Sequence, residues 1–337
     1  MIESIQFENF KALRDAKLSL GRFTLIVGPN GSGKSTALQA LKTSHAPPNY
    51  QYEHLVHVSG NERQTHNAVI RIMWSDSDKG FSSEASWQPN GQAFLKHAPP
   101  SGASVTQEIR NRLTNNLAKS RTYSLDANEI ALAVHLDKNM ELAENGQGLA
   151  GVLDRLRDLE PERFEALNDQ LGRWIPEFDR VLFDTPQKGH RSIFLRTRHG
   201  RNRIAARELS QGTLLALAML TLAYLPDPAP FIGFEEPDRG IHPRLLRDVR
   251  DALYRLAYPE NYGEDREPVQ VVATTHSPYF VDLFKDHPEE VIIAEKTGQE
   301  AKFIRLVDLP NVDEILRDAH LGDTWYAGVL GGVPSGS

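Results

Sequence analysis

Residues 28–36 read Gly-Pro-Asn-Gly-Ser-Gly-Lys-Ser-Thr, and this segment constrains the fold more than any other part of the chain. It fits the pattern G-x-x-x-x-G-K-[ST] of a phosphate-binding P-loop. The apolar run before it, residues 23–27, predicts a buried strand, and the run after it, residues 36–41, predicts a helix. A strand, a glycine-rich loop and a helix in this order let backbone N–H groups point at a polyphosphate. We therefore expect Lys34 to neutralise phosphate charge and the Ser35 hydroxyl to take one Mg²⁺ position.

Composition excludes several other classes of protein. The chain contains no cysteine, which rules out disulfides, thiol catalysis and thiolate metal sites and fits a cytoplasmic location. Its longest apolar run, residues 214–225, is shorter than a membrane span and predicts a buried helix. We find no basic segment leading into an apolar stretch at the N-terminus, so no signal peptide is expected. The net charge of −7 argues against a wholly basic nucleic-acid binder but leaves room for a local basic patch.

The pattern along the chain changes after the predicted P-loop helix. Residues 43–110 carry short apolar runs between Pro, Ser and Asn, which predicts hairpins and an antiparallel patch. Residues 148–173 show helical periodicity, with Pro161 dividing them into two helices. Residues 181–208 predict another hairpin, and helices and strands alternate from 209 onward, as in a parallel α/β core.

Two carboxylates follow a second predicted strand. Residues 231–234 are apolar, and Glu235 and Glu236 come directly after them. Ligands of α/β sheets bind beyond the carboxyl ends of the strands. One carboxylate there can hold Mg²⁺, and the next can orient the water that attacks a γ-phosphate. Two solvated glutamates are the simpler interpretation of this segment alone, but a P-loop on the same chain favours the magnesium site.

Two further segments could contact the phosphates of a bound nucleotide. His276 follows an apolar strand at residues 269–273 and could hydrogen-bond a γ-phosphate or the attacking water, although one histidine of twelve is weak evidence alone. Ser210 is expected to cap the apolar helix that follows it, and Gly212 opens the backbone there. A helix N-terminus of this kind suits an anion, and a plain helix cap is the simpler alternative.

Together the four segments resemble the ABC-type ATPases, in the order P-loop, signature, acidic strand and histidine switch. The sequences L-S-Q-G-T at 209–213, E-E-P-D-R-G-I-H-P at 235–243 and T-T-H-S-P at 274–278 are similar to the RecF/SMC-like and OLD-like branch. The resemblance implies an α/β P-loop NTPase with a mixed sheet, an antiparallel β patch and a helical lobe between P-loop and signature. It also implies a single domain over residues 1–337, with the hairpin-rich and helical lobe inserted at about 43–205.

The resemblance further implies a homodimer with two Mg·ATP held between the chains. The residues implied to hold the nucleotide are Gly28, Asn30, Gly31, Ser32, Gly33, Lys34, Ser35 and Thr36 of one copy and Ser210 and Gly212 of the other. Ser35 and Glu235 are implied to hold the metal, and Glu236, His276 and Lys34 to be catalytic. Glu235 departs from the Asp of many relatives, and its longer side chain is expected to bind Mg²⁺ through water.

The sequence does not assign the Q-loop glutamine or the residues that contact the adenine. Gln147 is one candidate for the glutamine of the Q-loop. Lys11 and Arg14 lie in the N-terminal strand region, where this branch often places adenine contacts.

The resemblance leaves two candidate roles. Transport is disfavoured by the lack of a membrane segment, and a long-armed SMC protein by the lack of heptads between Thr36 and Leu209. The first role is an ATPase that regulates a separately encoded nuclease or toxin, for example in phage defence. The alternative is a RecF-like ATPase of DNA repair or recombination. Residues 188–207 contain no acidic residue, and a phosphate backbone could bind there through Arg196, Arg198, Arg201 and Arg203.

Overall fold

The computed structural model describes residues 1–57, 66–75, 78–100, 104–298 and 300–332. The chain divides into two compact units. The first consists of Met1–Thr122, Ala229–Glu235 and Pro268–Ser337, and the second of Tyr123–Pro228 and Glu236–Glu267. The single domain with an insertion at about 43–205 stays a prediction.

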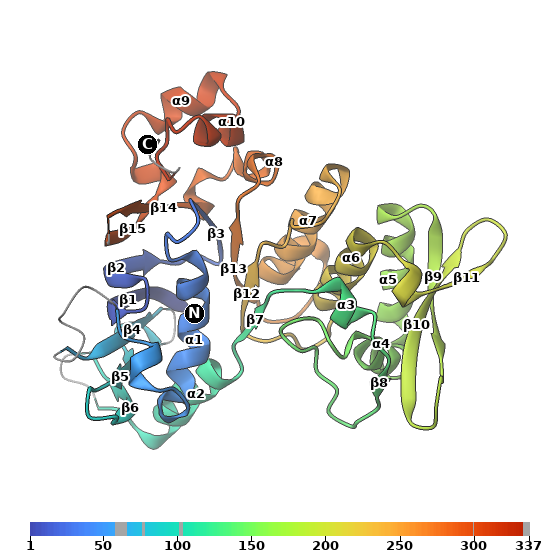
Figure 1. Cartoon of the computed structure of the whole chain (residues 1–337), viewed down its shortest axis with the longest axis horizontal. Helices are drawn as coiled ribbons and strands as arrows, with labels where there is room; N and C mark the ends of the chain where they lie inside the picture. The colour runs from blue at the N-terminus through green and yellow to red at the C-terminus, as the bar shows by residue number, and fades with distance from the viewer. Residues whose placement is uncertain (58–65, 76–77, 101–103, 299, 333–337) are drawn as a thin grey trace. The chain divides into compact units, whose positions relative to one another are not determined.

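A mixed six-stranded sheet positions the P-loop in the first unit (Figure 1). Its order is β15-β14-β3-β13-β12-β7, in which β3, β12, β13 and β14 run parallel and β15 pairs antiparallel with β14. Every residue of β3 and β13 is buried, as expected for apolar strands covered on both faces. The bounds are β3 Phe23–Val27, β7 Arg121–Tyr123, β12 Phe231–Glu235, β13 Gln270–Thr275, β14 Val291–Thr297 and β15 Glu300–Arg305.

A second sheet of the first unit is antiparallel and confirms the patch predicted within residues 43–110. Its order is β2-β1-β4-β5-β6. Along β1, Ile5 and Phe7 are buried and Glu8 is exposed, so the apolar side chains face the core. The bounds are β1 Ile2–Phe10, β2 Leu13–Ser19, β4 Ala68–Trp74, β5 Ser82–Trp87 and β6 Ala93–Ala98.

The described residues of the first unit also form α-helices. Helix α1, Lys34–His45, begins at the P-loop and packs against β12, β13 and α2, Gln107–Ala118. Three shorter helices follow β13 in sequence: α8 Pro278–Val281, α9 Val312–Asp318 and α10 Leu321–Tyr326, of which α10 packs on α8. None of the helices in the described part of the chain combines the length and apolar character needed to cross a membrane.

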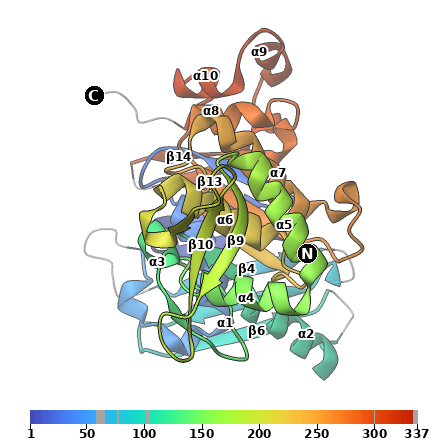
Figure 2. The same ribbon diagram turned by 90° about the vertical axis from the view of Figure 1, so that its right-hand side faces the viewer.

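The second unit combines helices with a small antiparallel sheet. Helix α4, Leu149–Leu159, and helix α5, Pro161–Trp174, confirm the predicted break at Pro161. They pack on strands β10 and β9 respectively (Figure 2). Helix α6, Gln211–Ala223, is buried from Thr213 to Ala223, which agrees with its apolar sequence. The other bounds are α3 Ala127–Ile130, α7 Leu246–Ala257, β8 Val134–His135, β9 Phe178–Asp184, β10 His190–Thr197 and β11 Arg203–Ala205.

A histidine links the antiparallel sheet to helix α2. His97 Nδ1 lies 2.7 Å from Ser83 Oγ, and His97 Nε2 lies 3.0 Å from Thr114 Oγ1. Trp74 Nε1 donates to Ser83 Oγ at 2.8 Å, so the serine hydroxyl can donate its own proton to the ring. This pattern fits a neutral imidazole. Burial lowers the pKa of His97, and the positive charge of Arg110 lowers it further.

We expect His97 to make the protein less stable in mild acid. Its pKa is lower in the folded chain than in the unfolded chain, so the unfolded state binds more protons once the pH falls below about 6.5. The contribution of neutral His97 is complete above that pH and is lost as the pH falls, together with a hydrogen bond of about 1 kcal/mol. The free energy of unfolding in urea, measured at pH 8 and pH 5, should fall less in His97→Gln than in the wild type. Equal falls would contradict this role of His97.

Candidate nucleotide-binding site

Three of the four sequence segments meet at one edge of the six-stranded sheet. Val27 at the end of β3 pairs with Thr275 at the end of β13, and Thr274 pairs with Glu235 at the end of β12. Because these strands are parallel, their carboxyl ends lie together. The P-loop follows β3, and His276 follows β13. The edge therefore gathers a glycine-rich loop, a carboxylate and a histidine.

The P-loop has the backbone that a phosphate cradle needs. Gly33 has φ +93° and precedes the first turn of α1. This backbone conformation strains any residue with a side chain, and a methyl group there would lie 2.4 Å from Leu13 Cδ2, which would have to shift. The buried Ser32 hydroxyl has no hydrogen-bond partner among the described residues. Such an atom is expected where a ligand supplies the missing partner.

Lys34 places its charge inside this loop. Its side chain is buried, and Nζ donates to the carbonyl oxygens of Gly28 and Pro29, each at 2.9 Å. Carbonyl oxygens solvate an ammonium group only in part, and a phosphate would offer it a stronger, charge-assisted hydrogen bond. The geometry fits the polyphosphate of a nucleotide.

The two residues expected at the metal meet directly. The hydroxyl of Ser35, at the start of α1, donates a short hydrogen bond to Glu235 Oε1 at the end of β12. Hydroxyl and carboxylate oxygens are hard ligands of the kind that Mg²⁺ prefers. The pair therefore fits a magnesium ion shared with a nucleotide phosphate.

The residue after Glu235 has a strained backbone. Glu236 has φ +48°, a left-handed conformation that costs a non-glycine residue about 1–3 kcal/mol. Its carbonyl oxygen accepts a hydrogen bond from Arg239 N at 3.0 Å, which closes a tight turn. Its carboxylate lies 3.9 Å from Arg239 Nη1. Strain of this kind is common at active sites and agrees with a chemical role for this side chain.

A hydrogen-bonded turn holds His276 at the sheet edge. Thr275 Oγ1 accepts a hydrogen bond from Ser277 N at 3.0 Å. Ser277 caps helix α8, since its Oγ accepts from Phe280 N at 3.3 Å. His276 is half-buried between these two anchored residues.

The signature segment forms the exposed N-terminus of α6 in the second unit. Ser210 Oγ accepts a hydrogen bond from Thr213 N at 3.2 Å, which confirms the predicted cap. Ser210 is exposed. A methyl group at Gly212 would lie 3.0 Å from Gly240 O, so the signature abuts the turn that follows Glu236.

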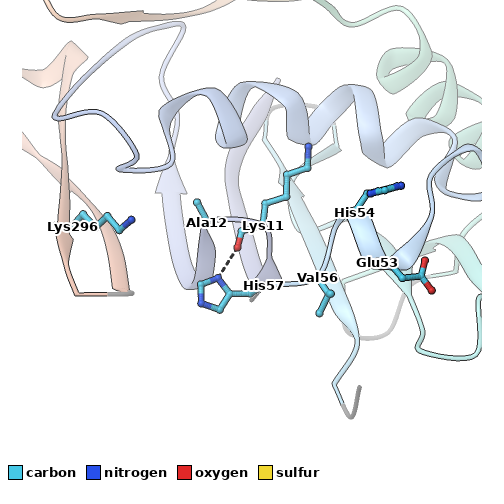
Figure 3. A pocket seen from close by; sticks show the side chains of 7 residues that line it. All are labelled: Lys11, Ala12, Glu53, His54, Val56, His57 and Lys296. Atoms are coloured by element: carbon cyan, nitrogen blue, oxygen red, sulfur yellow. Dashed lines mark hydrogen bonds between the residues drawn. The ribbon is translucent and has the colours of Figure 1, made fainter. Parts of the chain in front are cut away.

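A cavity of about 350 Å³ opens beside the P-loop in the first unit (Figure 3). Sequence reasoning selected Lys11 here but missed the other polar groups, because they come from distant parts of the chain. Arg14 is exposed on β2 and does not line the cavity. Gln147 is exposed in the turn before α4, and its Q-loop role stays a prediction. The cavity is lined by Lys11, Ala12, Glu53, His54, Val56, His57 and Lys296.

Two polar groups of this cavity differ in their partners. Lys11 Nζ donates to Gln39 Oε1 at 2.9 Å, and burial lowers the pKa of Lys11. His57 Nδ1 lies 2.5 Å from Lys11 O, whereas its buried Nε2 has no partner among the described residues.

The arginines proposed to contact nucleic acid are largely engaged within the second unit. Arg196 donates twice to Asp179, at 2.8 and 3.0 Å, and this interaction lowers the pKa of Asp179. Arg198 donates to Gly172 O at 2.8 Å. The guanidinium of Arg203 lies 4.7 Å from the ring centroid of Phe194. Arg201 is exposed at the tip of the hairpin.

Comparison with known proteins places the chain in a family of AAA domains. A family model described as an AAA domain, putative AbiEii toxin, type IV TA system, matches residues 47–282. A protein named OLD nuclease, from Thermus scotoductus, is 22% identical over 364 residues, which cover 96% of this chain and 68% of the relative.

Two solved structures are similar to this chain. The SMC head domain from Thermotoga maritima matches with a TM-score of 0.51 at 16% identity and covers 90% of this chain and 98% of that one. A structure titled as the recombination mediator protein RecF-ATPrS in the RecFOR pathway has a TM-score of 0.49 at 13% identity, with the same coverage of each chain. The likeness to the SMC head confirms the predicted α/β fold of the P-loop ABC type.

Proposed function

The chain belongs to the AAA-domain family described as putative AbiEii toxin of type IV TA systems, and from this premise we propose that it binds and hydrolyses ATP. The observation that carries the proposal is the hydrogen bond between Ser35 of the P-loop and Glu235 of the acidic strand. These residues are 200 positions apart, and the hydrolysis of Mg·ATP needs both at one place.

Each residue of the site has a role in the proposed reaction. The backbone of Asn30–Thr36 and the ammonium of Lys34 hold the triphosphate. Ser35 and Glu235 hold Mg²⁺, which when bound offsets charge on the phosphate oxygens. Glu236 orients a water molecule and accepts its proton, and His276 hydrogen-bonds the γ-phosphate.

We propose further that two copies of the chain complete each other's sites. Ser210 is exposed and caps helix α6, whose N-terminal backbone N–H groups attract an anion. In a head-to-tail dimer, Ser210 and Gly212 of one copy contact the γ-phosphate held by the other. Hydrolysis then depends on association of the two chains.

Ser210→Arg should block this association. An arginine side chain is much larger than serine, so we expect ATP to bind a single copy as in the wild type while turnover falls by about 100-fold. Steady-state hydrolysis and ATP titration of Ser210→Arg measure the two effects, with Arg207→Ala as a control just before the signature. Normal turnover in Ser210→Arg would contradict the shared site.

The biological output that we propose is control of a separately encoded effector, a nuclease or a toxin, as in phage defence. The toxin in the family description and the nuclease in the name of the Thermus relative support this choice. The alternative, a DNA-binding ATPase of repair or recombination, is supported less because Arg196 and Arg198 already have partners. Stable co-purification with a neighbouring gene product would favour the effector. A salt-dependent gel shift of DNA by the pure chain would favour the alternative.

A further inference from the structure

We propose that Lys296, on strand β14, is a second phosphate-binding lysine of the nucleotide site and lies outside all four sequence motifs. This inference rests on the proposed binding of ATP. It concerns a residue for which neither the P-loop pattern nor the acidic strand provides a signal.

The register of the sheet brings β14 alongside the P-loop. Strand β14 is parallel to β3, and Ile293 pairs with Val27, the last residue of β3. The chain continues as strand β14 beyond that pair, whereas β3 gives way to the loop. A methyl group at Gly28 would lie 2.3 Å from Ala294 O, so the two segments are in close contact. The residues after Ala294 therefore lie alongside the P-loop in space.

Lys296 directs its ammonium group to the middle of that loop. A methyl group at Gly31 would lie 3.7 Å from Lys296 Nζ. The side chain is exposed and forms no hydrogen bond or ion pair with the described residues. Lys34 differs, because its ammonium is held by two carbonyl oxygens. Lys296 is thus free to bind an anion that enters the loop.

The side chains that line the cavity beside the P-loop also favour an anionic ligand. In Figure 3, Lys11 and His57 lie between Lys296 at one end of the view and Glu53 at the other. The cavity has two ammonium groups and one carboxylate, that of Glu53. The buried Nε2 of His57 has no partner among the described residues. A cationic cavity of this size, which shares Lys296 with the surroundings of Gly31, suits a nucleotide whose phosphates pass Lys296.

The test compares Lys296→Ala with two variants by isothermal titration with ATP and with adenosine. We expect Lys296→Ala to bind ATP about tenfold more weakly, because a charge-assisted hydrogen bond to phosphate is lost. Lys296→Arg should keep most of the affinity. Adenosine has no phosphate, so its binding should be the same in all variants. Lys302→Ala is the matched control. In the register of β14 and β15, Lys302 lies opposite Glu295, so its side chain is on the other face of these two strands from Lys296.

The possible outcomes separate this inference from the proposed function. If the wild type does not bind ATP, the proposed function fails and the inference falls with it. If the wild type binds ATP and Lys296→Ala matches Lys302→Ala, the inference alone is overturned. An equal loss for ATP and adenosine in Lys296→Ala would also overturn it, because Lys296 would then contact the nucleoside instead of the phosphates.

Discussion

Lys34→Ala is expected to weaken ATP binding by about 100-fold or more. The substitution removes the one buried ammonium group of the P-loop, and hydrogen bonds to charged groups contribute about 1.5–3 kcal/mol each. It also leaves the carbonyl oxygens of Gly28 and Pro29 without the donor they have now. The loop then presents acceptors to an anionic ligand, so the loss should exceed that of a single contact.

The affinity of Lys34→Ala is measured by titration with ATP in the presence of Mg²⁺. Lys42→Ala is a suitable control, because Lys42 lies in the last turn of the same helix and is exposed. The melting temperatures of both variants show whether helix α1 is intact. Wild-type affinity in a folded Lys34→Ala protein would remove the P-loop assignment.

Glu236→Gln is expected to bind ATP normally and to hydrolyse it at least about 100-fold more slowly. The amide has nearly the shape of the carboxylate but cannot accept a proton from water, and general-base catalysis contributes about 10²–10⁴-fold. The strained backbone of Glu236 belongs to the turn closed by Arg239, and the substitution leaves this turn in place. In this variant the affinity for ATP should therefore stay at the wild-type value while the rate of hydrolysis falls.

Single-turnover hydrolysis with bound radiolabelled ATP measures the chemical step of Glu236→Gln directly. Glu267→Gln provides the matched control, because it makes the same change at an exposed glutamate of the second unit. Wild-type turnover in Glu236→Gln would mean that another group activates the water.

The sequence predicts the parts of this protein that depend on local patterns. The buried runs of β3 and β13, the cap at Ser210 and the break at Pro161 follow from apolar periodicity, capping and proline geometry, and each is present in the structure. The pairing of Ser35 with Glu235 follows from two motifs whose chemistry requires one magnesium ion. Local signals are sufficient for these features.

Other features depend on contacts between distant segments and could not be predicted. The sequence predicts that Arg196 is available to nucleic acid, because residues 188–207 contain no acidic residue, but Asp179 on the neighbouring strand β9 accepts its hydrogen bonds. Lys296 has no motif, and only the register of β14 against β3 brings it to Gly31. The left-handed backbone of Glu236 has no signal in its residue type.

The mass of Glu236→Gln in solution, with and without Mg·ATP, tests the central claim most directly. In this variant bound ATP persists, so a dimer that closes around it should accumulate. Multi-angle light scattering should give twice the chain mass of 37.8 kDa with Mg·ATP. The double variant Glu236→Gln with Ser210→Arg should have the mass of a single chain in the presence of Mg·ATP. A mass that ATP does not change, in a protein that binds ATP, would contradict a site shared between two copies.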